Sequence, residues 1–456
     1  MATNKSNAIE QNKTIETRSK EDGKSLDMLM GKLTKFGGFT FLESSVDGVQ
    51  NLNPERKARK NIFITDVNKK EERWALNTTI DLWLDLLNNS SNINEMIDKC
   101  KSKSESVTTK LAENQLLAAE KVRELERSYR GVMLFFRNTE ADKVPNLTIV
   151  NASKHQIADL DNTLFIDFIA AELKQHYDRL DLRENYSLLA LPGYLGSNMV
   201  LEKWAKIAYA NKVQLFTDFA HLDKPDDVVE MFFTSNMSSV DTFKSNSIMT
   251  CNWLVGRPKY KEIGEEEDLM VPPSIGLMGR VYMTRMSQVA AGKKYGALNE
   301  VNEVAFGLKK SEVSQLERMG LVPMVKEYGK VMAFSAKTLF NGDNLGLQTY
   351  SVVRVFDYVT KVLFDFLNRR AFENWNIKTE KDLRGQIVKF LDNVQGPERL
   401  IKEFKLIRLE QDKENKDRVH LSIYITPYFP GKSFIIQLDG TKGDDYVDWV
   451  AEYQQQ

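Results

Sequence analysis

The chain has 456 residues, of which 42% are hydrophobic and 28% are charged, and its net charge is −1. This composition excludes a collagen-like chain, a disulfide scaffold and a wholly disordered chain, and the length predicts about three domains. The balanced charge provides no global attraction for nucleic acid or for an anionic membrane surface. Two cysteines, no signal-like apolar start and no apolar run of about 18 residues predict a soluble cytoplasmic protein.

Residues 1–60 are predicted to form a flexible N-terminal arm that carries one short amphipathic helix, 25–36. Its apolar side chains recur at helical spacing, and two glycines directly after the helix end the pattern. These side chains are Leu26, Leu29, Met30, Leu33 and Phe36. The helix either docks on the protein's own core or is a peptide that the groove of a partner binds.

Residues 61–145 are predicted to contain an isolated strand followed by helices. The strand, 61–67, contains Ile62, Phe63 and Ile64 between charged flanks, so it needs a sheet elsewhere, in its own subunit or in another. Apolar residues then recur with the helical period from Trp74 to residue 100, with a break at 88–91 and Asn92 as a cap. The Ser/Lys-rich segment 101–110 is expected to be a loop before another helix, 111–130.

Residues 146–300 are predicted to form a central α/β domain with a buried, largely parallel sheet, because short apolar runs alternate with helical patterns. The expected elements are, in order, strand 147–150, helix 163–180, strand 187–191, helix 197–210 and strand 213–216. Residues 221–272 show the least regular pattern, so an exposed loop or an irregular outer lobe is expected there. The acidic run 264–268 within it is expected to be solvated.

Residues 301–440 are predicted to form a C-terminal domain of helices and strands. The expected elements are helix 309–320, a hairpin over 321–339 that turns at Tyr328 and Gly329, helices 348–375, 380–394 and 397–404, and paired strands 418–426 and 433–439. The long helix carries an apolar stripe, with Arg354, Lys361, Asp365 and Arg369 off that stripe. Residues 441–456 are expected to be a polar tail.

No catalytic constellation, metal-ligand pattern or cofactor motif is found in the sequence. Gly-Lys-Ser at 431–433 ends like a phosphate-binding loop, but Thr426 stands where that loop requires a glycine. The chain contains no CxxC, HExxH or GxSxG pattern and only four histidines. The sequence therefore indicates a non-enzymatic structural or interaction protein of mixed α/β class, without a cofactor.

Several segments in chain order resemble the TssC family, the large subunit of the bacterial type VI secretion contractile sheath. They are LERSYRGVMLFFRNT (125–139), LTIVNASKHQIADL (147–160), PSIGLMGRVYMTRMSQ (273–288), LKKSEVSQLERMGLVPMVKEYGKVMAFSAKTLF (308–340) and YSVVRVFDYVTKVLFDFLNRRAFENW (350–375). The last three are similar to the shared core of phage-tail-type sheath proteins. The resemblance covers roughly 74–440 and indicates an outlying branch of the family.

This resemblance implies a phage-tail-sheath-like fold and a set of partners. They are a small, TssB-like sheath subunit that forms a heterodimer with residues 61–145, other copies of the chain, an Hcp-like inner tube, a baseplate and a ClpV-like ATPase. Strand exchange would use Ile62, Phe63, Ile64, Leu421, Ile423, Ile425, Phe434 and Ile436. Arg354, Lys361, Asp365 and Arg369 are candidates for facing the tube, and the ATPase would grip helix 25–36.

Two alternatives remain open from the sequence. The sheath of a phage-like or other extracellular contractile injection system would share the fold without needing a second sheath subunit. An α/β enzyme with an unrecognised site is the other alternative.

Overall fold

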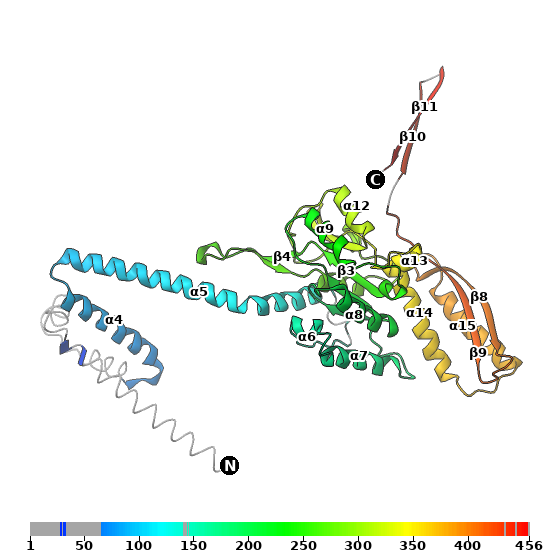
Figure 1. Ribbon diagram of the computed structural model, residues 1–456, viewed down its shortest axis with the longest axis horizontal. Coiled ribbons are helices and arrows are strands. Elements are labelled where there is room, and N and C mark those ends of the chain that lie inside the picture. Colours follow the sequence, from blue (N-terminus) through cyan, green and yellow to red (C-terminus); the bar gives the residue numbers. More distant parts are fainter. Residues whose placement is uncertain are drawn as a thin grey trace, which may run out of the picture. The chain divides into compact units, whose positions relative to one another are not determined.

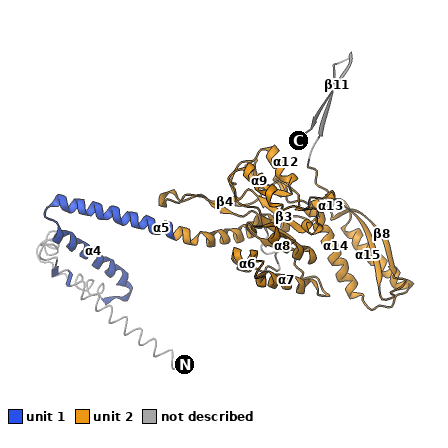
Figure 2. Ribbon diagram, viewed as in Figure 1, with its two compact units in different colours: residues 1–117 blue, residues 118–456 orange. Residues whose placement is uncertain are grey.

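The computed structural model describes residues 28–29, 31–32, 65–139, 144 and 146–432, with the backbone of 435–442 and 445–454. The chain divides into two compact units, residues 1–117 and 118–456 (Figure 2). Helix α5 (Ile93–Arg137) begins in the first unit and ends in the second.

The first unit consists of helices. The short 3₁₀ helix η2 (Val67–Lys69) is capped by Asp66, and α4 (Lys70–Asn89) follows it. Asn92 precedes α5 as the expected cap, and its side chain accepts a hydrogen bond from the amide of Glu95. The predicted loop at 101–110 is wrong, because α5 continues through it. That segment contains no glycine or proline, and the high helix propensity of its lysines compensates for the lower propensity of its serines.

The second unit is built on a five-stranded sheet in the order β1-β2-β3-β6-β7, whose first four strands run parallel. Its strands are β1 (Leu188–Leu191), β2 (Gln214–Asp218), β3 (Ser247–Cys251), β6 (Leu321–Glu327) and β7 (Lys330–Ala333). The predicted parallel sheet is therefore confirmed. The antiparallel hairpin β6–β7 turns at Tyr328 and Gly329, both with positive φ, as a two-residue turn between twisted strands requires.

Two predictions for the central region are wrong. Residues 147–150 are exposed and belong to no strand of the described chain. Conversely, 221–272 is not an irregular lobe, because it supplies β3, the middle strand of the sheet, with every residue buried. Since β3 is covered on both faces, its sequence Ser-Ile-Met-Thr-Cys shows no polar alternation that would have indicated a strand.

Helices and shorter strands surround this sheet (Figure 1). They are α6 (Lys154–Ala158), α7 (Leu164–Tyr177), α8 (Asn198–Ala210), α9 (Pro225–Ser235), η4 (Thr242–Asn246), β4 (Leu254–Arg257), η5 (Lys261–Ile263), β5 (Leu269–Val271), α10 (Ser274–Met283), α11 (Gly292–Tyr295), α12 (Lys310–Arg318) and α13 (Leu345–Gln348). Strands β4 and β5 form an antiparallel ribbon.

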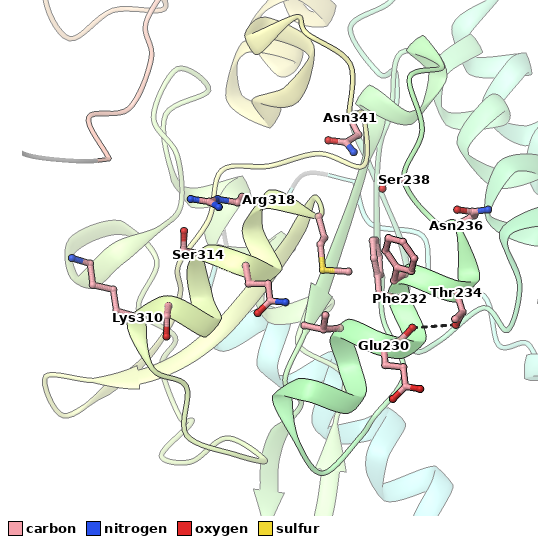
Figure 3. A pocket seen from close by; sticks show the side chains of 14 residues that line it. Glu230, Phe232, Thr234, Asn236, Ser238, Lys310, Ser314, Arg318 and Asn341 are labelled. Carbon is pink, nitrogen blue, oxygen red and sulfur yellow. Dashed lines mark hydrogen bonds between the residues drawn. The ribbon is translucent and has the colours of Figure 1, made fainter. Parts of the chain in front are cut away.

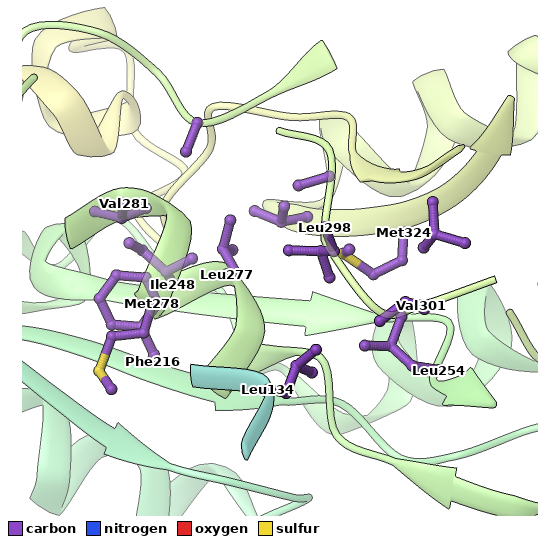
Figure 4. Close-up of a cluster of buried hydrophobic side chains, with 14 of the residues drawn as sticks. Leu134, Phe216, Ile248, Leu254, Leu277, Met278, Val281, Leu298, Val301 and Met324 are labelled. Carbon is purple, nitrogen blue, oxygen red and sulfur yellow. The ribbon is translucent and has the colours of Figure 1, made fainter. Parts of the chain in front are cut away.

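Two hydrophobic cores lie on opposite faces of the sheet, because successive side chains of a strand point to opposite sides. Phe216 and Ile248 belong to the core that includes Leu134 of α5 and Leu277 of α10 (Figure 4). The adjacent residues Leu215 and Met249 belong to the other core, with Trp204 of α8 and Leu316 of α12. The end of α5 is thus part of the central fold.

The C-terminal region packs two helices against a long ribbon. Helix α14 (Tyr350–Arg369) and helix α15 (Ile377–Val394) share a core with β8 (Ile401–Gln411) and β9 (Val419–Pro427). The predicted helix 397–404 is wrong, because its second half is already strand β8. Gly396 stops the helical pattern, and β9 offers β8 an antiparallel partner.

The chain continues into a second hairpin, β10 (Ile435–Lys442) with β11 (Asp445–Gln454). Two predictions change as a result. Residues 418–426 pair with 401–411 instead of 433–439, and 445–454 form a strand in place of the expected polar tail.

Candidate assembly interfaces

A groove of about 1170 Å³ lies between α9 and α12 (Figure 3). Phe232, Phe233 and Met319 contribute apolar surface to it, and Lys310 and Arg318 of α12 are among its lining residues. None of its lining residues is a histidine or a cysteine. Among the described residues, no group of three His, Cys, Asp or Glu side chains could hold a metal ion.

The charged side of α14 packs inside the second unit, which corrects part of the predicted tube-facing surface. Arg354 is half-buried, and its Nη1 donates to the carbonyls of Val281 (2.6 Å) and Thr284 (3.4 Å) at the end of α10. The Nζ of Lys361 donates to the carbonyl of Tyr186 at 2.8 Å. Arg354 and Lys361 therefore hold this chain's own fold together.

Loss of hydration disfavours the charged forms of Arg354 and Lys361. It lowers the pKa of Lys361 to about 8 and the pKa of Arg354 to about 10, because a buried cation loses its hydration. Asp357, one turn from each, accepts a hydrogen bond from Asn246 at 2.7 Å. This polar side of α14 fixes the helix to the central sheet, while Val355 and Val359 pack toward α15.

The other two tube-facing candidates lie closer to the surface. Asp365 accepts a hydrogen bond from the amide of Leu182 at 3.0 Å and also pairs with Arg369. The side chain of Arg369 is 55% exposed. A tube contact remains a prediction only for Arg369 and Asp365.

The β8–β9 ribbon carries three of the predicted strand-exchange residues. Leu421, Ile423 and Ile425 alternate along β9 and pack half-buried against the core of α14 and α15, as their period of two predicts. Among the described strands, β8 and β9 pair only with each other, so each leaves an outer edge without a ladder partner. Such edges are ready templates for strands of other chains.

Of the remaining strand-exchange candidates, only Ile436 lies in a described segment, and there only its backbone is described. Ile62, Phe63 and Ile64 lie outside the described residues, as does Phe434. Ile436 belongs to β10, where its backbone is opposite Tyr453 of β11. The end of the predicted strand 61–67 is wrong, because Asp66 caps the 3₁₀ turn that begins at Val67.

The predicted N-terminal helix is described in part. Residues 28, 29, 31 and 32 are helical, and Leu29 is buried against Ile80 and Leu84 of α4. Leu26, Met30, Leu33 and Phe36 lie outside the described residues. For Leu29, the first of the two sequence interpretations holds in this structure, because its side chain packs on the protein's own core.

A buried ion network attaches α5 to the β4–β5 ribbon within the second unit. The carboxylate of Glu265 accepts hydrogen bonds from Arg257 Nη1 (2.6 Å) and Arg257 Nη2 (3.1 Å) and from the amide of Tyr260 (2.9 Å). Arg123 of α5 pairs with the same carboxylate, and Arg127 Nε donates to the carbonyl of Met270 at 2.9 Å. Its hydrogen bonds with Arg257 lower the pKa of Glu265 to about 2.

This network was not predicted from the sequence, because the acidic run 264–268 was expected to be solvated. The available signal was the spacing of Arg123, Arg127 and Arg130, which places three guanidinium groups on one side of a helix. The opposite side of the same turns is apolar and exposed, with Leu125 72% and Tyr129 63% accessible. An exposed apolar side opposite a fixed side indicates a surface that another chain covers.

Comparisons with known proteins give three family matches in chain order. The TssC/VipB-like N-terminal region matches residues 26–115, the type VI secretion system TssC/VipB central domain matches 117–341, and the TssC/VipB-like C-terminal domain matches 349–455. No curated protein matches the sequence.

Solved structures similar to this chain include three from contractile systems. A chain of the anti-feeding prophage baseplate is 15% identical, with 66% of this chain and 83% of that chain covered and a TM-score of 0.46. A chain of the PVC sheath complex of an extracellular contractile injection system, in the contracted state, is 14% identical, with 67% and 90% covered and a TM-score of 0.43. The sheath tail protein of Desulfitobacterium hafniense is 10% identical, with 64% and 60% covered and a TM-score of 0.40.

Proposed function

This chain belongs to the TssC/VipB family and is a structural subunit of a contractile type VI secretion sheath; we propose that it polymerises with a small, TssB-like subunit around an Hcp-like inner tube. Contraction of that polymer propels the tube out of the cell. The observation that carries the proposal is the succession of the three family domains over 26–455. The mixed α/β class and the sheath resemblance expected from the sequence are confirmed.

The β8–β9 ribbon could link neighbouring copies of the chain in such a polymer. The β8–β9 ribbon presents main-chain edges without described partners, and a strand added at either edge would extend the ladder. Main-chain ladders between copies keep subunits connected while the polymer changes shape. The segment containing Ile62 and Ile64 remains the predicted strand that a neighbouring copy would contribute.

The remaining partners complete the proposed cycle. A baseplate starts the polymer, and a ClpV-like ATPase recycles contracted sheaths through the N-terminal helix that contains Leu29. No helix in the described part of the chain is long and apolar enough to cross a membrane. We place the sheath in the cytoplasm, because the family drives its tube outward from inside the cell.

Negative-stain imaging of the full chain co-expressed with its small subunit and tube protein tests the proposal. Hollow tubes with ridged walls are expected, and a small partner should co-purify. Dispersed particles only, without tubes or a partner, would overturn the proposal. A sheath that assembles from this chain without any second subunit would instead support the extracellular type of system.

Two substitutions then test the linkage between copies. Ile423→Pro removes a strand amide and fixes φ, and this defect recurs in every subunit, so tubes should be lost. Paired lysines at Ile62 and Ile64 should leave the heterodimer folded but unable to form long sheaths. If this second variant unfolds the heterodimer, that strand belongs to its own subunit's core, and its assignment as an exchange strand is wrong.

A further inference from the structure

The turn between α14 and α15 holds an aromatic ring entirely in solvent. Phe372 is fully exposed, more than any other large apolar residue in the described part of the chain, whereas its neighbour Trp375 is half-buried against the core of α14 and α15. The backbone of Phe372 has φ +68°, in the left-handed region that bulky residues rarely adopt. Neither the exposure nor the strain stabilises this chain, so the ring indicates a contact with another molecule.

The turn around Phe372 is braced by polar contacts on both sides. Arg370 Nη2 donates to Glu373 Oε2 and to Asp382 Oδ2, each at 2.7 Å, so one guanidinium group joins the turn to α15. Asn376 Oδ1 accepts hydrogen bonds from two amides of the first turn of α15, both at 2.9 Å. A ring on a braced turn loses little conformational freedom when a partner buries it, which favours its use as an interface anchor.

The groove between α9 and α12 has the surface that such a ring requires. Its volume is about 1170 Å³, and Phe232, Phe233 and Met319 contribute apolar surface to it. Phe233 is 79% exposed, so this surface has no cover among the described residues. Lys310 and Arg318 also line the groove, and neither forms an ion pair within the described part of the chain.

Charge complements the apolar match between the turn and the groove. Residues 371–377 contain one charged residue, Glu373, whose side chain remains 40% exposed beside Phe372. Its sign is opposite to that of Lys310 and Arg318 in the groove. Opposite charges at the edge of an apolar contact favour one orientation of the two surfaces.

The groove cannot receive the ring of its own chain. Figure 1 shows the turn between α14 and α15 at the end of these helices that is remote from α9 and α12. When two matching surfaces lie apart on one chain, each copy offers one surface to the next copy and the other surface to the copy before it. Such a head-to-tail contact builds helical polymers when its rotation does not close a ring.

We propose that Phe372 of one copy inserts into the α9–α12 groove of a second copy within the sheath. The inference rests on the proposed function, because it requires a polymer of this chain, and it is separate from the strand pairing proposed for the β8–β9 ribbon. The Phe372 ring is the apolar anchor, and Glu373 lies against Lys310 and Arg318 of the second copy.

Phe372→Gly separates this role from a structural one. Glycine adopts positive φ without strain, so the heterodimer of the variant with its small subunit should unfold at the same temperature as wild type or higher. Co-expressed with the small subunit and the tube protein, the variant should give about tenfold less pelleted sheath. A lower unfolding temperature would show that Phe372 holds its own fold and would overturn the inference.

Phe233→Ser tests the groove in the same sheath assay. It should cause a loss like that of Phe372→Gly, and the double variant should lose little more than either single variant, because both remove one contact. Met199→Ser is the matched control, since Met199 is 71% exposed on α8, and it should change the yield less than about threefold. A loss from Phe372→Gly alone would mean that the ring binds elsewhere, which also overturns the inference.

Cross-linking tests the contact directly while Phe372 is kept. In a Cys100→Ser background, Asn374→Cys beside the ring and Ser314→Cys in the groove should let a short bismaleimide join neighbouring copies of an assembled sheath into covalent multimers. Glu414→Cys in place of Ser314→Cys should give no multimers.

The outcomes separate the inference from the proposed function. Wild-type sheath yield from both Phe372→Gly and Phe233→Ser, or no cross-link between copies, overturns the inference while the proposed function stands. Sheaths of Phe372→Gly that polymerise normally but lack the tube would assign the ring to the tube and overturn it as well. If the wild-type chain forms no sheath at all, the proposed function itself fails.

Discussion

Replacement of Glu265 by glutamine should release α5 from the β4–β5 ribbon. The carboxylate accepts three hydrogen bonds from Arg257 and Tyr260 and pairs with Arg123, and its side chain is 6% exposed. Glutamine has nearly the same shape but keeps one acceptor oxygen, and its amide presents N–H donors to two guanidinium groups. The substitution therefore removes the charge without creating a cavity.

The expected loss of stability is about 2–3 kcal/mol. The pKa of Glu265 falls from 4.5 to about 2, which corresponds to about 3 kcal/mol of preference for the charged form. Loss of one partner of a buried ion pair costs about 3–5 kcal/mol in other proteins. We take the lower range because glutamine retains part of the hydrogen bonding and because Arg123 is partly solvated.

Urea unfolding of the purified full-length chain, followed by circular dichroism, measures this loss. Because the folded pKa is lowered, the contribution of Glu265 is fully present above pH 4.5 and is lost as the pH falls toward 2. The difference between wild type and variant should therefore shrink with acidification. Glu266→Gln, an exposed neighbour, is the control and should change stability by less than about 0.5 kcal/mol. A variant as stable as wild type at pH 7, or a difference that grows in acid, would refute the reasoning.

Three further substitutions test other parts of the fold by thermal and urea unfolding. Gly320 has φ +97°, and an added Cβ would lie 2.9 Å from the carbonyl oxygen of Thr338, so Gly320→Ala should lower the free energy of unfolding by about 1–2 kcal/mol. Gly385 lies in open space within α15, so Gly385→Ala should instead stabilise the fold by about 0.5–1 kcal/mol. Asp218→Asn should cost about 2–4 kcal/mol, because the buried carboxylate accepts four hydrogen bonds, one from the amide of Gly193, one from Thr250 of β3 and two from Ser274 at the start of α10. Near-neutral stability would argue against this role. The lowered pKa of Lys361 means that the unfolded chain holds that proton more tightly, so wild-type stability should rise between pH 8 and 10.5, and Lys361→Met should abolish that part of the rise.

The parallel sheet could be predicted from sequence because its first two strands, β1 and β2, follow the local rules. The runs at 188–191 and 214–218 are short, apolar and separated by a helix, and they pair as expected. The middle strand β3 could not be found in this way. Thr250 in this strand donates a tertiary hydrogen bond to Asp218, which a single sequence does not show.

The assembly surfaces were predictable only as residue patterns. The apolar alternation of β9 correctly predicted which side chains pack on α14 and α15. The charged side of α14 was predicted to face the tube, but this helix packs on two sides, so charges opposite an apolar stripe did not mean exposure. The guanidinium group of Arg354 donates hydrogen bonds to carbonyls at the end of α10. No local sequence pattern distinguishes such an arginine from one that is exposed to water.

The two bulges in the β8–β9 ribbon have a consequence for newly synthesised copies. The register shifts between Ile401 and Glu403 and again between Leu406 and Arg408, and each shift twists the outer edge of β8 locally. A flat strand from an unrelated protein cannot follow an edge with these two offsets and with lysines along it. If a neighbouring copy contributes a strand here, as proposed, only a strand with matching offsets can extend this edge, and the same offsets protect the unassembled copy from pairing with unrelated strands.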